Sequence, residues 1–229
     1  CRQIIYLGGI TYQEQKSPHL SSRQAVEGIL KNSGIHYTSL RAGIIIGSGS
    51  ASFEIIRDLV EKLPVMVAPR WLNILHQPIA ISDVIFYLSQ VLDNPKCMNG
   101  TFDISGPDIL TYKDMLLTVA RIRGLKRFIL TVPVLTPRLS SYWLYFVTST
   151  SFSLARTLVE SMKYEVIARQ TDILEILSHQ CLSFDQAVRR AFARIEENQV
   201  ISSWKDAWSS GRIADAYSHF IQVPVHGCL

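Results

Sequence analysis

A histidine and an arginine four residues apart are the side chains of this sequence best suited to chemistry. His19 and Arg23 follow Ser17-Pro18, a typical helix start with proline at the first helical position. Side chains four residues apart on a helix project to the same side. Arginine stays charged and suits a ribose, a phosphate or a carboxylate, and histidine exchanges protons near neutral pH. The pair is therefore either a surface pair or part of a binding site.

A tyrosine and a lysine at the same spacing stand just before that helix. Tyr12 and Lys16 match the general acid–base pair of many nicotinamide reductases, in which the cation lowers the pKa of the phenol. Such a pair works only when both side chains share one face of a helix. Because these two residues precede the helix start, we interpret the match as accidental.

Glycines stand where two predicted strands end. Gly8-Gly9 closes an apolar run, and Gly47-Ser-Gly-Ser50 follows the strand predicted over 37–46. Glycine lets backbone approach a ligand closely, and ligands of open α/β sheets lie just beyond the carboxyl ends of the strands. Gly8-Gly9 is therefore either a ligand contact or a tight turn without a ligand. The second loop can cradle an anion, but it is neither a Walker loop nor G-x-G-x-x-G.

Strands and helices that would position these residues alternate along the chain. This order predicts right-handed βαβ units on a parallel sheet and hence an α/β fold. Ser82-Asp83 is expected to cap the third of the helices. The predicted strands cover 3–7, 37–46, 78–81, 101–105 and 128–134, and the predicted helices cover 17–32, 53–63, 84–92 and 112–123.

The last third of the chain has a weaker pattern. Residues 139–168 have helical spacing and include the aromatic segment 142–146, which is either helix core or a membrane-surface contact. Ser183 and Gln186 resemble a capping box before a helix that runs to Glu197. Serine and glycine then predict a linker over 201–211.

Composition excludes several classes of protein. Of the 229 residues 48% are hydrophobic and 18% charged, which excludes a disordered chain. The net charge of +4 comes without a run of Lys or Arg, so we expect no nucleic-acid partner. No apolar run approaches the roughly 18–20 residues of a membrane span. Four cysteines lie far apart without a C-x-x-C pair, which predicts reduced thiols in the cytoplasm and no metal site.

Taken in order, these segments resemble the second half of an extended or atypical short-chain dehydrogenase/reductase. In that family a strand ends in a catalytic Ser, a helix carries Tyr-x-x-Ser-Lys, and a later strand ends in Leu-Arg-Pro-Gly. The resemblance covers roughly residues 2–200 and is strongest to the NmrA-like or YbjT-like proteins. The segments that carry it are Ile5-Tyr-Leu-Gly-Gly9, His19-Leu-Ser-Ser-Arg-Gln-Ala-Val-Glu27, Leu40-Arg-Ala-Gly43, Gln77-Pro-Ile-Ala-Ile-Ser-Asp-Val84, Phe102-Asp-Ile-Ser-Gly-Pro107 and Leu110-Thr-Tyr112.

The resemblance implies a partial Rossmann-type parallel sheet flanked by helices, with a small α/β substrate lobe. It implies NAD or NADP as the cofactor, with Arg23 at the position of the lysine that holds the nicotinamide ribose. It places the glycine-rich dinucleotide loop before Cys1, so we expect the chain to be an internal piece of a longer protein. The implied cofactor-binding residues are Gly8, Gly9, Ile10, Arg23, Arg41, Ala42, Gly43 and Ile44.

The resemblance also implies a division of the chain. Residues 1–200 would be the carboxyl-terminal part of the nucleotide-binding domain, 201–211 a linker, and 212–229 the first strand of a second domain.

Three departures from the family pattern alter the expected chemistry. Gly9 or Gly8 stands at the serine position, His19 at the tyrosine and Arg23 at the lysine. Standard carbonyl reduction lacks its hydroxyl and its phenol in such a site. The leading hypothesis is therefore a redox or nucleotide sensor, or an accessory protein. The alternatives are an active oxidoreductase or epimerase, with His19 as acid–base on a small carbonyl or nucleotide-sugar-like substrate, and a membrane-surface partner protein.

Overall fold

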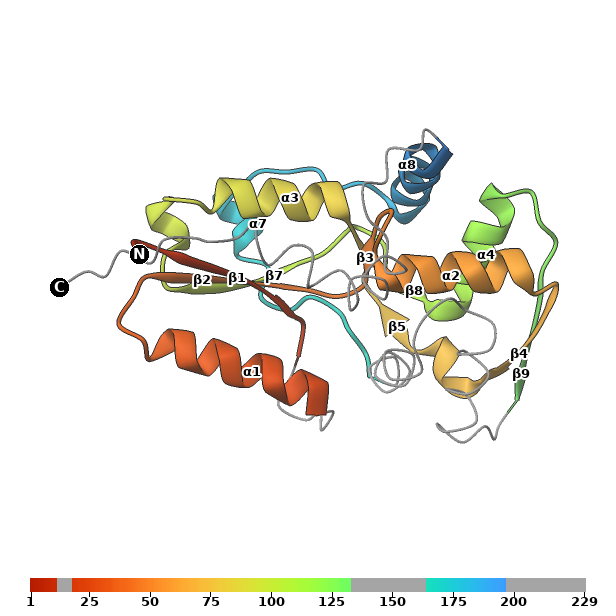
Figure 1. The fold of residues 1–229 in the computed structure, drawn as a ribbon, viewed down its shortest axis with the longest axis horizontal. Helices are drawn as coiled ribbons and strands as arrows, with labels where there is room; N and C mark the ends of the chain where they lie inside the picture. Colours follow the sequence, from red (N-terminus) through yellow and green to blue (C-terminus); the bar gives the residue numbers. More distant parts are fainter. Residues whose placement is uncertain (12–17, 133–163, 197–229) are drawn as a thin grey trace, which may run out of the picture.

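The computed structural model describes residues 1–11, 18–132 and 164–196 (Figure 1). These parts of the chain form short, mostly parallel sheets flanked by helices, as the alternation of strands and helices predicts. The strands are β1 (Ile4–Gly9), β2 (Tyr37–Ala42), β3 (Ile45–Ile46), β4 (Val65–Pro69), β5 (Leu75–His76), β6 (Ile79–Ala80), β7 (Gly100–Ile104), β8 (Leu110–Thr111) and β9 (Phe128–Val132).

The helices lie on both sides of this framework. None of them within the described ranges is long and apolar enough to cross a bilayer. The helices are α1 (Pro18–Lys31), α2 (Ala51–Lys62), α3 (Ile81–Gln90), α4 (Tyr112–Ile122), α7 (Ile173–Ile176) and α8 (Phe184–Glu196), with short 3-10 helices at Arg70–Asn73 and Pro95–Cys97.

The central sheet consists of three parallel strands in the order β1-β2-β7. Gly9 of β1 pairs with Ala42 of β2, which pairs with Ile104 of β7, so the carboxyl ends of all three strands meet at one edge. Helix α1 covers one face, and α3 and α7 cover the other (Figure 1). Such double cover is the usual surrounding of a parallel sheet, and it explains why β2 is buried along most of its length.

The described residues form two apolar cores. The first packs β2 and β7 against α3 and α7 and includes Leu40, Tyr87 and Phe102. The second packs α2, α4 and α8 around Phe53 and Phe192, whose rings meet edge to face at 5.4 Å. This second core has β4 and β9, a parallel pair, on one side (Figure 1). It corresponds to the small α/β lobe that the resemblance implies.

Local sequence signals start and stop the helices of the second core. The hydroxyl of Thr111 accepts the N–H of Asp114, and the Asp114 carboxylate accepts the N–H of Thr111, which completes a capping box at α4. Ser183 and Gln186 form the same reciprocal pair at the start of α8, as predicted. Gly124, with φ of +66°, follows the end of α4.

The structure corrects several sequence-based predictions. The strand predicted over 37–46 is two strands. Strand β2 ends at Ala42, and β3 pairs with β6 rather than with a strand of the central sheet. Residues 164–168, the end of the helix predicted over 139–168, are not helical, and Val166 forms a parallel bridge with His76. Helix α3 begins at Ile81 with no side-chain cap, so Ser82-Asp83 lies inside its first turn.

Some predictions fall on residues that the structure does not describe. These are the Tyr12–Lys16 pair, the aromatic segment 142–146, the linker 201–211 and the second domain at 212–229. They stay predictions.

Candidate cofactor-binding site

The carboxyl edge of the central sheet brings together most of the residues predicted to bind a cofactor. Gly8 pairs with Arg41 and Gly9 with Ala42, so the ends of β1 and β2 lie side by side. Beyond β1 the backbone N–H of Ile10 donates to the carbonyl of Ala42 at 3.0 Å, and Ile10 is buried. The two strand ends therefore form one continuous backbone surface.

Arg23 reaches this edge from α1. A Cβ added to Gly9 would lie 2.5 Å from Nη1 of Arg23 and 3.5 Å from its Cζ. Only glycine leaves room for the guanidinium to lie against the strand end in this way. Among the described residues, none forms a hydrogen bond or an ion pair with Arg23. A guanidinium in such a place suits an anion or a hydroxyl-rich ligand.

His19 lies one helical turn before Arg23. Helix α1 begins at Pro18, as the sequence predicts, and both residues belong to it. The side chain of His19 lies outside the described residues, so its backbone position alone supports its place near the site.

Arg41, by contrast, is held within the protein. Its Nε donates to Oδ1 of Asp103 at 2.7 Å, and its Nη2 donates to Gln170 at 2.8 Å. The other oxygen of the buried Asp103 carboxylate accepts the N–H groups of Arg169 and Gln170. Arg41 therefore joins the segment after residue 164 to the sheet through its side chain.

Ala42, Gly43 and Ile44 close the end of β2 against other parts of the protein. Ala42 is buried in the first core, and Ile44 packs against the second. A Cβ at Gly43 would lie 3.0 Å from Cγ1 of Val166 and 3.2 Å from the carbonyl of Gln77. Gly43 is thus needed for a close approach of three chain segments, which is a structural reason for a glycine there.

Gln77 is a positioning residue of this edge that the cofactor prediction did not include. Its Nε2 donates to the carbonyl of Gly106, and its Oε1 accepts the N–H of Ala168. The side-chain amide of Gln77 thereby links the turn that follows β7 to the segment that contains Val166. The Gln77-Pro motif was visible in the sequence, but the two partners lie 29 and 91 residues away.

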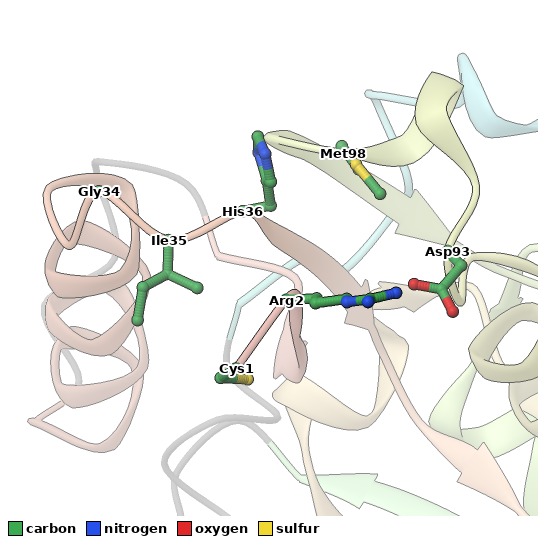
Figure 2. A pocket seen from close by; sticks show the side chains of 7 residues that line it. All are labelled: Cys1, Arg2, Gly34, Ile35, His36, Asp93 and Met98. Carbon is green, nitrogen blue, oxygen red and sulfur yellow. The ribbon is translucent and has the colours of Figure 1, made fainter. Parts of the chain in front are cut away.

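A hollow lies at the opposite edge of the sheet (Figure 2). It has a volume of about 690 Å³ and is open to solvent, and Arg2 points toward the carboxylate of Asp93 across it. It lies at the amino ends of β1 and β2, whereas ligands of open α/β sheets bind at the carboxyl ends. Its lining residues are Cys1, Arg2, Gly34, Ile35, His36, Asp93 and Met98.

Neither a protein-family model nor a curated protein matches this sequence. Solved structures do match it. A nucleoside-diphosphate-sugar epimerase from Staphylococcus aureus is 13% identical with a TM-score of 0.62, over 82% of this chain and 64% of that one. A NADPH-dependent quinone oxidoreductase from Escherichia coli is 15% identical with a TM-score of 0.64, over 83% of this chain and 68% of that one.

A third similar structure is a dTDP-4-dehydrorhamnose reductase from Bacillus anthracis in complex with NADP. It is 13% identical with a TM-score of 0.61, over 84% of this chain and 66% of that one. At these identities the comparison establishes architecture. The chain has a Rossmann-like fold. It spans about two thirds of the length of the enzymes that share it.

Proposed function

We propose that this chain belongs to an NAD(P)-binding protein of the reductase fold whose catalytic triad is altered, and that it acts as a redox or nucleotide sensor or as an accessory protein. The Rossmann-like architecture supports the class of ligand. The sequence contains no G-x-G-x-x-G loop. The proposal therefore assigns to these residues the nicotinamide end of the dinucleotide only.

The observation that carries the proposal is the guanidinium of Arg23 lying against Gly9 at the carboxyl edge of the sheet. This is the edge at which open α/β sheets bind nucleotides. The cation has no described protein partner, and the glycine beside it leaves the backbone accessible. A ribose hydroxyl or a phosphate oxygen is a suitable acceptor for its N–H groups.

The same geometry supports loss of ordinary carbonyl reduction. With glycine at Gly9, no hydroxyl is available there to polarise a carbonyl, and α1 carries His19 where the resemblance expects a tyrosine. Arg23 keeps the positive charge of the family lysine but cannot give up a proton in proteins. Cofactor binding without turnover is the outcome that such a set of residues supports.

The test is calorimetric titration of the full-length protein with NADH and NADPH. Replacing Arg23 by Ala removes a charge-assisted hydrogen bond worth roughly 1.5–3 kcal/mol, so Kd should rise about 10- to 100-fold. Arg189→Ala is the matched control, because Arg189 lies on the exposed side of α8 and pairs with Asp185. Equal affinity in wild type and Arg23→Ala would reject the assigned contact.

An active oxidoreductase or epimerase is the second candidate, supported by the position of His19 one turn before Arg23 on α1. Imidazole can exchange protons near neutral pH in place of a phenol. Oxidation of NADPH with a carbonyl or nucleotide-sugar substrate should then occur and should disappear in His19→Phe. Dinucleotide binding without such oxidation supports the sensor.

A further inference from the structure

A carboxylate, an imidazole and a thiol meet between α3 and the segment before α8. Asp83, His179 and Cys181 each present one ligand atom, and these three atoms lie within 4.8 Å of one another. Nε2 of His179 lies 3.0 Å from Oδ1 of Asp83. None of the three residues belongs to the proposed cofactor site.

Each of the three side chains is held in place by its surroundings. The second oxygen of Asp83 accepts the N–H of Leu182 at 2.9 Å, which leaves Oδ1 directed at His179. The imidazole of His179 stacks on Phe86 with ring centroids 3.9 Å apart. The hydroxyl of Tyr87 lies 3.5 Å from Sγ of Cys181. Partners that orient ligands in this way are typical of metal sites.

The cluster is sheltered and still reachable from solvent. Asp83 is buried, whereas 21% of the His179 side chain is exposed. Buried carboxylates are stabilised by pairing with a cation or by coordinating a metal. A divalent cation at this point would supply the charge and would find an entry path past the imidazole.

We propose that Asp83, His179 and Cys181 bind a zinc ion. Thiolate, imidazole and carboxylate are the three ligand types that zinc takes from proteins. An ion about 2.0–2.3 Å from each ligand in tetrahedral geometry holds the ligand atoms about 3.3–3.6 Å apart. Oδ1 and Nε2 are already close to that separation, and Sγ of Cys181 lies within 4.8 Å of both. Water takes the fourth position.

The bound ion would tie α3 to the segment that leads into α8. Asp83 lies in the first turn of α3, whereas His179, 96 residues further along the chain, and Cys181 lie between α7 and α8. Scattered cysteines predict no metal site when sequence neighbours alone are considered. The proposed site arises from the fold, which places a His-x-Cys segment against a distant aspartate.

The test uses the full chain, freed of metal with a chelator and titrated with Co²⁺, which takes the same ligands as zinc and is coloured. The expected result is one equivalent bound, with a thiolate-to-cobalt charge-transfer band that Zn²⁺ abolishes. Cys181→Ser should remove the band. His179→Gln and Asp83→Asn should weaken binding by at least the roughly 10- to 100-fold that loss of an outer partner costs.

Controls separate this site from other thiols and imidazoles of the chain. Cys1→Ser and His36→Gln, both at the opposite edge of the sheet, should bind Co²⁺ as wild type does. X-ray absorption of the zinc-loaded wild type needs no variant and should show one sulfur ligand among nitrogen and oxygen ligands. A metal shell without sulfur, or a charge-transfer band that survives in folded Cys181→Ser, overturns the proposal.

Discussion

Asp103 of β7 joins Arg41, at the end of β2, to the segment after residue 164. Its side chain is fully buried, and it accepts hydrogen bonds from Arg41 and from the backbone of Arg169 and Gln170. A buried carboxylate is tolerated only with such partners, because removing it from water is costly. The Asp103 carboxylate therefore helps to hold the segment after residue 164 against the sheet.

Replacing Asp103 by Ala should lower the free energy of unfolding by about 3–5 kcal/mol, because the largely buried guanidinium of Arg41 loses its charged partner. Urea denaturation measures this change. Asp185→Ala is the control, since the exposed Asp185–Arg189 pair on α8 contributes less than about 1 kcal/mol. A similar loss in both variants would contradict the role given to Asp103.

Tyr112 is a residue at which the fold leaves a polar group unsatisfied. Its hydroxyl is fully buried, and no described residue forms a hydrogen bond with it. Burial raises the pKa of this phenol above its ordinary value. The folded state therefore holds the proton more tightly than the unfolded chain, whose tyrosines titrate near about pH 10. Stability is fully present below that pH and falls as the pH rises above it.

Tyr112→Phe should leave the melting temperature at neutral pH unchanged or higher, because a desolvated hydroxyl is removed without loss of a partner. It should also reduce the fall in melting temperature between about pH 8 and pH 11. Tyr6→Phe on β1, a half-buried position, is the control. If Tyr112→Phe lowers the free energy of unfolding at neutral pH by more than about 1 kcal/mol, the hydroxyl has a hydrogen-bond partner.

At the scale of elements, α4 and α8 show how local signals place the second core. The capping box of Thr111 and Asp114 fixes the first turn of α4, which directs Met115 and Val119 into that core. The capping box of α8 does the same for Phe192. Each helix starts where its own residues satisfy the free N–H groups of the first turn.

Thr111→Ala removes the acceptor for the N–H of Asp114 and should cost about 1 kcal/mol of unfolding free energy. Thr118→Ala within the same helix is the matched control and should be near neutral, since alanine favours a helix interior. Thermal denaturation of the two variants gives the comparison. An equal effect of both would show that the cap contributes nothing.

The sequence predicts these elements only where polar and apolar residues alternate visibly or a cap marks the end. Strand β4 has no alternating pattern in the sequence, because its first four residues, Val65 to Ala68, are all apolar. In the structure Val65 and Val67 are exposed, whereas Met66 and Ala68 are buried. Alternation in burial thus exists without alternation in residue type, and the partner strand β9 lies about sixty positions away.

The candidate site was predicted in the same uneven way. Gly9 and Arg23 lie within one βα unit, so helix spacing and the strand end sufficed to place them together. The ion pair between Arg41 and Asp103 could not be predicted from the sequence, because the two residues are 62 positions apart. Gly43 was predicted to face the cofactor, and the structure places Val166 and Gln77 against it.

At the scale of the whole molecule, the central sheet has two ends with different character. The carboxyl edge combines glycines, an arginine without a partner among the described residues, and a backbone surface, while the amino edge has an open hollow (Figure 2). Strand β1 is the outer strand of the sheet within the described residues, and Leu7 on it is 37% exposed. Additional strands of a larger Rossmann-like sheet would extend it from this side.

An NMR titration that follows glycine amides at both ends of the sheet is the most direct test of where a dinucleotide binds. Heteronuclear NMR of the ¹⁵N-labelled full-length protein would follow the amides of Gly8, Gly9, Gly43 and Gly34 during titration with NADH and NADPH. The first three lie at the carboxyl edge, and Gly34 lies at the hollow. We expect the amides of Gly8, Gly9 and Gly43 to shift while that of Gly34 stays in place. Shifts confined to Gly34, or no shift at saturating dinucleotide, would contradict the account.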